Sequence, residues 1–527
     1  MGGIRSVSTY ITDMKLPNTI QEIGDGAFSG CYLLENINIP ESVKSIGDGA
    51  FSGCSSLKSI NIPKALVSIG SRAFERCISF QEIEIPNEIP EIGESPFLDC
   101  FEMKKIVAPF KMMPMFDPTS LFKLESIILT TPIDGDISDK NYYNKNPKFL
   151  KLIYSNSIKE IVVSASDEAY CSVDGIIYSK DTTSLVLFPR GKDVADFVVD
   201  YPTTQISANA FSWCEQLQDL TIGSAVLEIG AYAFCDCHHL ESIQLKDGIE
   251  RISYDAFANC SKLRNIEIPR TVKSIDKDCF KRCDSLVSVR IMGESCSLAQ
   301  GAFENCSLLE YLEINGGRIN SHTTFENAVN LKYIKLGQYF SMQNYLAELV
   351  FASSPMIEEV EIDCEIGTLG MFRNKERLEK VIIGNSVTVI NAHAFEGCYA
   401  LSEVWIGNSV ASIADEAFMN CSSLKDMYIS SIVPPLLGTN ALPTAYGTRG
   451  NDNTLLTIHV PFGCKNAYES AEGWSNYNIV EEAPLTVHDI TSNSLYNKSS
   501  LFDLQGKRVL KMKRGGIYIK NKKKIKL

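Results

Sequence analysis

The chain contains 527 residues, of which 45% are hydrophobic, and its formal net charge is -14. This length excludes one compact core, because single cores stop growing at roughly 250–300 residues. The negative balance argues against nucleic acid as a partner, since phosphate binding needs a basic surface. The sequence has no apolar run of roughly 18 residues or more, so we expect no transmembrane segment.

The first ten residues lack the basic and then apolar layout of a signal peptide. Ile11, Met14 and Leu16 already fit a repeat strand, with no capping segment before them. Repeat arrays normally cover their ends, because an open end exposes core side chains. We therefore expect that upstream residues are missing from this sequence, and favour this over an intracellular protein.

A period of 23 residues governs most of the chain. Cysteine recurs at this spacing in three runs: Cys31, Cys54, Cys77 and Cys100; Cys214, Cys237, Cys260, Cys283 and Cys306; Cys398 and Cys421. Between the second and third runs, Ala328, Ser354 and Lys375 occupy the cysteine slot. A phenylalanine precedes the slot by three residues in all fourteen units, from Phe28 to Phe418. Such self-similarity is typical of a repeat architecture.

Each unit reads approximately A-F-x-x-C-x-x-L-x-x-I-x-I-P-x-x-V-x-x-I-G. The L-x-x-I-x-I part predicts a strand with both isoleucines facing inward, and the proline ends it. The V-x-x-I-G part predicts a short return strand or 3₁₀ turn, after which Ala-Phe packs between coils. We therefore expect a mainly β leucine-rich-repeat solenoid with short 3₁₀ or helical turns, forming a right-handed curved array of about 15 coils of 23 residues.

This pattern closely resembles the BspA-type (Treponema-type) leucine-rich-repeat family over most of residues 11 to 430. Tyr170, Asp174–Tyr178 and Pro189–Lys192 resemble a hairpin insert common in that family, and Asp-Gly is itself a hairpin turn signal. The resemblance implies a secreted or cell-surface adhesion protein that binds protein or glycan ligands on host or neighbouring cells. We expect it to act as a monomer.

Five segments are expected along the chain. They are N-terminal repeats (1–109), an irregular repeat with the hairpin insert (110–200), the main repeats (201–430), a capping unit (431–484) and a short basic β tail (485–527). From Gly506 onward the tail has ten Lys or Arg and no acid. Leu501–Val509 and Gly515–Ile519 resemble a shortened bacterial C-terminal sorting domain. Sorting, anchoring and simple capping all stay open as its role.

Seventeen cysteines raise the question of disulfides or metal. Stacked slots place Cα atoms about 5 Å apart, but their parallel Cβ vectors do not suit the disulfide dihedral. We therefore expect a structural ladder of small buried thiols: Cys31, Cys54, Cys77, Cys237, Cys260, Cys283, Cys398 and Cys421. Cys235 and Cys237 beside His238 and His239 superficially resemble a zinc cluster, but Cys237 should face inward. We expect no metal and no cofactor.

Catalytic constellations are not evident in the sequence. The six histidines occupy non-equivalent repeat positions, and no nucleophile elbow, zinc-protease motif, P-loop or dinucleotide-binding motif occurs. Neighbouring acids such as Glu358 and Glu359 should point to opposite faces of a strand. We therefore expect a non-enzymatic protein with no catalytic residues.

The residue between the two isoleucines of L-x-x-I-x-I should face solvent. This position is polar in the earlier coils but becomes Ile382, Trp405 and Tyr428 near the end, with Tyr311 and Tyr333 on the preceding column. Exposed aromatic patches usually mark contact surfaces, so these five are the candidate ligand-binding residues. The alternative is that residues 434–484 fold back over them as a cap.

Three functions fit these observations. The first is an adhesion protein that binds macromolecules through its sheet face. The second is a carbohydrate- or peptide-capturing module of a surface assembly, with the aromatic column as its platform. The third is a passive structural spacer.

Overall fold

The computed structural model describes residues 3–4, 10–86, 89–137, 146–342, 346–364, 371–443, 456–482, 502–503, 517–520 and 523–526. The chain forms two compact units, each described here by itself. Unit 1 comprises Met1–Leu286 with Gly301–Phe303, and unit 2 comprises Val287–Gln300 with Glu304–Leu527.

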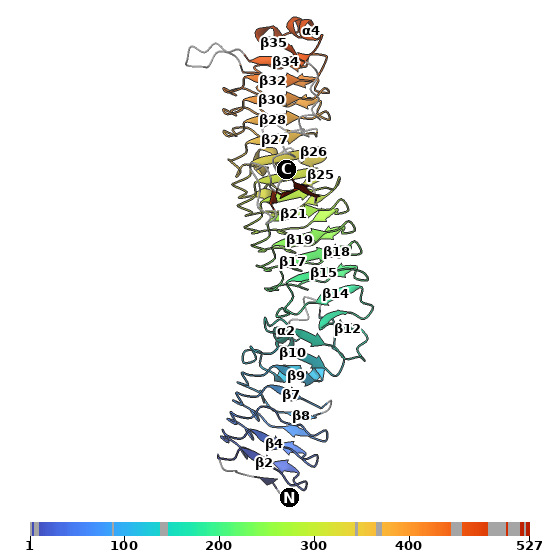
Figure 1. Cartoon of the computed structure of the whole chain (residues 1–527), viewed down its shortest axis with the longest axis vertical. Coiled ribbons are helices and arrows are strands. Elements are labelled where there is room, and N and C mark those ends of the chain that lie inside the picture. The colour runs from blue at the N-terminus through green and yellow to red at the C-terminus, as the bar shows by residue number, and fades with distance from the viewer. Residues whose placement is uncertain are drawn as a thin grey trace. The chain divides into compact units, whose positions relative to one another are not determined.

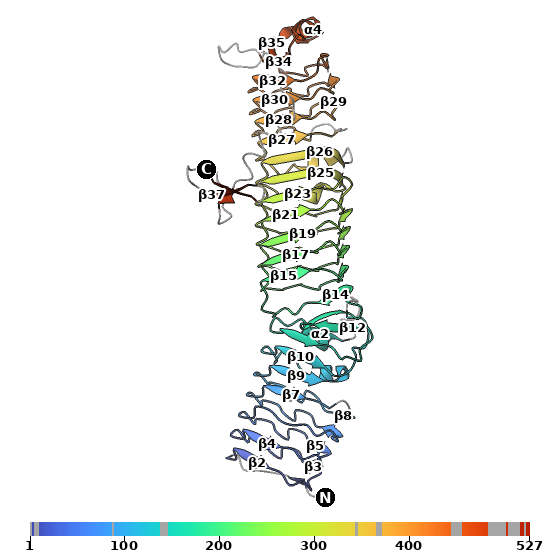
Figure 2. The same cartoon turned by 45° about the vertical axis from the view of Figure 1, so that its right-hand side comes forward.

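Unit 1 is a solenoid in which most coils contribute a front strand and a shorter return strand (Figures 1 and 2). Its front strands are β2 (Asp13–Lys15), β4 (Asn36–Asn38), β7 (Glu82–Glu84), β9 (Lys105–Ala108), β10 (Ser126–Leu129), β11 (Glu160–Val162), β15 (Asp196–Val199), β17 (Asp219–Ile222), β19 (Ser242–Leu245) and β21 (Asn265–Ile268). Its return strands are β1 (Gly3–Ile4), β3 (Glu22–Ile23), β5 (Ser45–Ile46), β6 (Ser68–Ile69), β8 (Glu91–Ile92), β14 (Ser184–Leu187), β16 (Gln205–Ile206), β18 (Glu228–Ile229), β20 (Arg251–Ile252) and β22 (Ser274–Ile275). Two short helices, η1 (Phe110–Met115) and α2 (Pro147–Ile153), complete the repeats.

Unit 2, taken by itself, has the same coil design (Figure 2). Its front strands are β23 (Ser288–Ile291), β25 (Tyr311–Ile319), β26 (Tyr333–Met342), β27 (Glu359–Ile362), β28 (Lys380–Ile383), β30 (Glu403–Ile406), β32 (Asp426–Ile429), β34 (Thr457–Pro461) and β35 (Asn478–Glu482). Its return strands are β24 (Ser297–Leu298), β29 (Val389–Ile390), β31 (Ser412–Ile413) and β33 (Leu436–Leu437). Its helices are η2 (His322–Phe325), α3 (Ala347–Val350), α4 (Lys465–Ser470) and η4 (Trp474–Asn476).

The alternation predicted for the front strands is visible in β21. Ile266 and Ile268 are buried, whereas Asn265 and Glu267 are exposed. Equivalent residues of neighbouring coils pair in parallel without a shift, as Leu220 does with Ile243. A one-residue slip would expose every isoleucine, so burial of one face fixes this register.

The conserved slots of the repeat stack into ladders inside the solenoid. The ring of Phe257 lies 5.0 Å from that of Phe234 and 5.1 Å from that of Phe280, with planes nearly parallel. The Sγ atom of Cys260 donates to the carbonyl oxygen of Phe234 at 3.2 Å. All seventeen cysteines are free thiols, and burial raises the pKa of Cys260 well above its ordinary value. The slot thus joins successive coils without a covalent bond.

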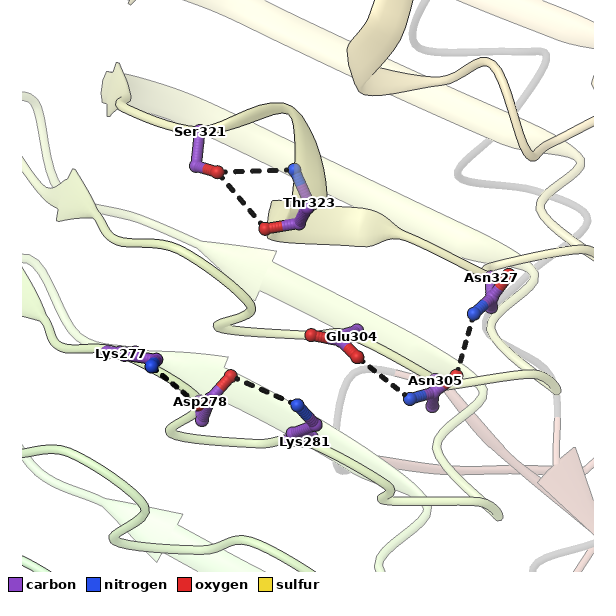
Figure 3. A network of polar contacts seen from close by, with 8 residues as sticks. All are labelled: Lys277, Asp278, Lys281, Glu304, Asn305, Ser321, Thr323 and Asn327. Atoms are coloured by element: carbon purple, nitrogen blue, oxygen red, sulfur yellow. Dashed lines mark hydrogen bonds and ion pairs between the residues drawn. The ribbon is translucent and has the colours of Figure 1, made fainter.

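Side-chain amides add a contact between two neighbouring coils of unit 2. Asn305 and Asn327 both adopt left-handed backbone conformations with φ of 63°. In unit 2 the amide nitrogen of Asn327 donates to Asn305 at 2.8 Å, and Asn305 donates to Glu304 at 3.1 Å (Figure 3). Asparagine tolerates this conformation better than most residues, so at these two positions the same side chain suits both the turn and the contact.

The region after Phe110 keeps the parallel strand pairing of the solenoid although its coils differ in length. Strands β9, β10 and β11 pair in parallel, with Ile127 opposite both Ile106 and Ile161. The estimate of about 15 coils was therefore too low, and the solenoid has about 19 turns. The 23-residue spacing undercounts because these coils differ in length while their strands keep register.

The insert in unit 1 is a β-hairpin. Strands β12 (Tyr170–Val173) and β13 (Ile176–Ser179) pair antiparallel, and β13 pairs with β14 (Figure 1). Asp174 and Gly175 connect them with φ of 50° and 73°. Positive φ at both central residues is the geometry of a type I′ turn, which Asp-Gly favours.

The last coils of unit 2 end in a small helical cover. Tyr468 of α4 donates its hydroxyl to the carbonyl oxygen of Ser431 at 2.8 Å, and the indole of Trp474 donates to Pro435 at 2.8 Å. Both rings are fully buried. Strands β34 and β35 extend the sheet beyond β32 instead of crossing its outer face.

Most of the predicted sorting-like tail lies outside the described residues. Its three short strands, β36 (Phe502–Asp503), β37 (Ile517–Lys520) and β38 (Lys523–Lys526), pair antiparallel. Among the described residues, no helix has the length and apolar character that crossing a membrane requires.

Candidate functional site

The front sheet of unit 2 carries one continuous row of outward-facing side chains, which we call the outer column. Parallel register places one member on each of β23, β25, β26, β27, β28, β30, β32 and β34. In that order the members are Arg290, Glu313, Lys335, Glu361, Ile382, Trp405, Tyr428 and His459. The residues on either side of Trp405, Val404 and Ile406, are buried in the core, so Trp405 itself faces away from it.

The first half of the outer column consists of alternating charges. Arg290 contacts Glu313 at 2.8 Å, and Lys335 contacts Glu361 at 2.7 Å. Glu361 is buried, and its Oε2 atom has no hydrogen-bond partner among the described residues. Burial raises the pKa of Glu361, and the Lys335 ammonium only partly opposes this shift. Each basic residue of the charged half therefore pairs with an acidic one, and Oε2 of Glu361 is a carboxylate oxygen that these ion pairs do not use.

The second half of the outer column is an aromatic stack. The Trp405 and Tyr428 rings are 3.8 Å apart with planes 7° from parallel. The His459 ring continues the stack at 4.3 Å and 15° from Tyr428. The strand separation of about 4.8 Å places such rings face to face, so their edges point to solvent. We call these three residues the aromatic stack.

The stack is less exposed than we expected from the sequence. Ile382 has 0% and Trp405 only 9% of its surface exposed, and with the partly buried Tyr428 they form a small apolar cluster outside the main core. The expectation of an exposed patch is therefore wrong for Ile382 and Trp405. Neighbouring large side chains at strand spacing cover one another, which the sequence pattern alone does not show.

Acidic side chains surround the aromatic stack. The indole nitrogen of Trp405 donates to Glu403. The His459 ring lies between Asp426, at 2.9 Å, and Glu482, at 2.8 Å. Partial burial raises the pKa of Tyr428, and the nearby carboxylates raise it further. The aromatic stack is thus an apolar surface bordered by negatively charged carboxylates.

The other two predicted residues lie elsewhere. Tyr311 and Tyr333 pair with each other on the flanking column, and Tyr333 pairs next with Glu359. The Tyr311 hydroxyl donates to Glu313 at 3.1 Å, so this pair belongs with the charged half. His459 was missed, because the sequence placed it only among scattered histidines. The strand-like run Thr457–Pro461 is the signal that would have extended the column to it.

The residues that superficially resemble a zinc cluster each have another partner. Cys235 Sγ hydrogen-bonds to Asp236, His238 Nδ1 contacts the carbonyl oxygen of Asn259, and His239 pairs with Glu215. These partners lie in different directions along the coils.

A different trio could hold a metal ion. His393, Glu396 and Glu416 each place one ligand atom within 4.8 Å of the others. Arg373 already pairs with Glu396 at 2.9 Å, which neutralises one of the carboxylates. We therefore interpret the trio as an ion-pair network.

Comparison with known proteins gives the family but no curated relative. No curated protein matches the chain. Among solved structures, a leucine-rich repeat protein from Bacteroides ovatus is 25% identical, with 62% of this chain and 78% of that chain covered and a TM-score of 0.35. A leucine-rich cell surface protein from Faecalibacterium prausnitzii is 22% identical, with coverage of 60% and 90% and a TM-score of 0.32. The pneumococcal vaccine antigen PcpA is 15% identical, with coverage of 92% and 83% and a TM-score of 0.25.

A family model gives a wider match. The BspA type leucine-rich repeat region matches in six copies over residues 7–123, 204–332 and 311–425. These segments cover more than half of the chain and include Trp405, whereas Tyr428 and His459 lie beyond the last matched residue. The chain therefore belongs to the BspA type leucine-rich repeat family.

Proposed function

We propose that this chain is a non-enzymatic, secreted or cell-surface binding protein. Its ligand would be a macromolecule on host or neighbouring cells, held at the outer face of the unit 2 sheet. The observation that carries the proposal is the preformed stack of Trp405, Tyr428 and His459 on that face. Family membership supports it, because repeat arrays of this kind offer extended surfaces rather than reaction centres.

The chemistry of the stack favours a protein ligand over a glycan at this position. A sugar would need free aromatic faces, but the faces of Tyr428 are occupied by Trp405 and His459. Ring edges and indole or phenol polar groups suit protein side chains, and Trp and Tyr are enriched among residues that dominate protein interfaces. Stacking also fixes the rings in advance, so little rotamer entropy is lost on binding.

The charges around the stack favour a basic segment of that ligand. Glu403, Asp426 and Glu482 lie against the ring system, while His459 is the basic group between two of them. The chain as a whole carries -14. Complementary charge raises the association rate and selects among partners.

A non-enzymatic role agrees with the surroundings of the histidines. Among the described residues, His239, His393 and His459 pair with carboxylates. His238 contacts a backbone carbonyl. None of these contacts joins a histidine to a serine or cysteine nucleophile, as nucleophilic catalysis would need.

An array of extracellular-matrix proteins and glycans tests the binding proposal. Wild-type protein should bind one or more proteins, and Trp405→Ala or Tyr428→Ala should weaken this binding by roughly 30-fold, the effect of removing an interface hot spot. Tyr399→Ala is the matched control, because Tyr399 is 50% exposed in unit 2 and is not a member of the outer column. Equal loss in all three variants, or unchanged binding in folded stack variants, would refute the assignment. Absence of binding to every protein and glycan on the array would favour a passive structural spacer.

Cell fractionation with proteolysis of intact cells tests the proposed location. Protease added outside should cleave the protein while a cytosolic marker stays intact. Recovery from the cytosol alone would contradict display or secretion.

A further inference from the structure

A groove of about 790 Å³ lies in unit 1 beside the hairpin insert, and none of its lining residues was singled out as a site from the sequence. Its volume falls within the range of about 300–1,000 Å³ that is typical of ligand pockets. Small residues that follow the return strands line its floor: Ser207, Ala208, Gly230, Ala231 and Ser253. The strands that border it, β12, β14 and β18, are labelled in Figure 1.

Three hydrogen bonds, all buried or partly buried, hold one wall of the groove. The hydroxyl of Tyr170, on β12, donates to Asp136 at 2.9 Å and accepts from the backbone of Ile137 at 3.1 Å. The backbone of Ile133 donates to Asp167 at 2.8 Å. These contacts hold the preceding loop against the hairpin, so the groove is preformed, which lowers the entropy lost on binding.

A row of polar side chains runs along the groove, one from each coil. Ser184, Gln205, Glu228 and Arg251 pair in register on β14, β16, β18 and β20. Ser184 donates to Gln205, and Gln205 to Glu228, at 3.4 Å in each case. Hydrogen bonds of this length are weak, so their donors and acceptors keep most of their capacity for a ligand.

An ordered aromatic pair stands at the end of this row. Tyr254 lines the groove with 43% of its surface exposed, and its ring meets that of Tyr232 edge to face at 5.1 Å. Tyr232 has a φ of 57°, and the same turn position of the next two coils is also left-handed, with φ of 53° at Asp255 and 56° at Asp278. This conformation is therefore a general feature of the repeat turn.

We propose that this groove binds a linear, uncharged oligosaccharide. Tyr254 supplies an apolar surface for the C–H face of a sugar ring, and the polar row supplies donors and acceptors for hydroxyls. The row repeats at the strand spacing of about 4.8 Å, close to the length of one pyranose unit in a linear chain. The inference rests on the chain being a binding protein, but not on the outer column.

The charges at the groove exclude acidic glycans. Asp136 and Glu228 both line it, and an anionic sugar would meet these two carboxylates. Arg251 is the basic residue of the lining, and its guanidinium is held by Asp276 at 2.7 Å. The net local charge is therefore negative, as a neutral ligand tolerates and an anion does not.

The full-length protein can be tested with defined sugars. Saturation-transfer NMR would survey neutral tetrasaccharides of β-1,4-glucose, β-1,4-N-acetylglucosamine, α-1,4-glucose and α-1,6-mannose, with tetragalacturonate as the acidic comparison. Calorimetry would then measure affinity for the best probe. We expect at least one neutral probe to bind, and Tyr254→Ala and Glu228→Gln each to lower its affinity at least tenfold.

The matched control is Tyr32→Ala. Tyr32 is 44% exposed in the same unit and also meets a tyrosine edge to face, Tyr10 at 6.4 Å, but it lies outside the groove. Unchanged affinity in this variant supports the site. Binding of no neutral probe, preference for tetragalacturonate, or equal affinity in the groove variants would overturn the proposal. A parallel titration with an extended basic peptide distinguishes a peptide groove, and binding of that peptide alone would also overturn it.

This test separates the groove from the proposed function. Loss of sugar binding in Tyr254→Ala, with array binding intact, concerns the groove alone. Loss of array binding in Trp405→Ala, with sugar binding intact, concerns the outer column alone.

Discussion

Removing one ring from the phenylalanine ladder should destabilise the solenoid strongly. Phe257 is fully buried between Phe234 and Phe280, at ring distances of 5.0 and 5.1 Å. A buried Phe→Ala substitution costs about 3–5 kcal/mol through lost burial and the remaining cavity. Because each stacked pair adds about 0.5–1.5 kcal/mol beyond area burial, two stacks place Phe257→Ala near the upper end of that range, about 5 kcal/mol.

The matched control for this substitution is Phe122→Ala in the same unit. Phe122 also stacks, on Phe101 at 5.7 Å, but 57% of its surface is exposed. It should therefore cost about 1 kcal/mol or less, the contribution of one exposed stack. The comparison isolates burial from stacking.

Urea titration followed by circular dichroism would measure both variants, and hydrogen exchange would locate the damage. Each coil contacts only its neighbours, so protection should fall around residues 234–280 and persist around residues 28–74. Equal destabilisation by Phe257→Ala and Phe122→Ala would refute the ladder as the source of stability. Uniform loss of protection along unit 1 would refute its coil-by-coil nature.

Three further outcomes are expected. Lys375, buried in the cysteine slot, has its pKa lowered by burial, so the folded state binds fewer protons than the unfolded state and stability rises with pH near the lysine pKa. Lys375→Cys should therefore raise the free energy of unfolding by about 1 kcal/mol or more at about pH 7 and by less at about pH 10. A gain in stability at about pH 7 that is no larger than the gain at about pH 10 would contradict this. Ellman's reagent should label the native protein slowly and at most at the half-exposed Cys171 and Cys235, because burial raises the pKa of both thiols; rapid labelling of more sites would show that the cysteine ladder is not buried. Binding at the aromatic stack should weaken as salt rises from about 50 to 500 mM, and salt-independent affinity would exclude a basic ligand segment.

The 23-residue period was sufficient to predict the solenoid. Phe257 and Cys260 occupy the slots that the consensus assigns, and both are buried in stacked ladders. The period failed where coil length changes. Ile106, Ile127 and Ile161 stand opposite one another at unequal sequence spacing, so the number of turns was underestimated. Strand pairing tolerates loops of different length, and a fixed period does not detect them.

The candidate site was predicted less completely. Alternation correctly identified which face Trp405 and Tyr428 occupy, because side chains in a strand point to opposite faces in turn. It could not show that the rings stack at 3.8 Å and cover each other. His459 joins them from a coil that follows a longer connection, outside the repeat spacing. The groove was missed because its walls come from a loop, a hairpin and three coils, which no local pattern connects.

The most direct test of the binding account is flow cytometry with fluorescently labelled protein on a panel of epithelial and bacterial cells. Three proteins would be compared, all with wild-type circular dichroism spectra: the wild type, the double variant Trp405→Ala/Tyr428→Ala and the control Tyr399→Ala. We expect the wild type and the control to bind at least one cell type equally. At protein concentrations well below the wild-type Kd, the double variant should lose about 90% of that signal or more, because occupancy there falls in proportion to a roughly tenfold or greater loss of affinity. Full binding by the folded double variant would contradict the assignment of the outer column as the binding surface.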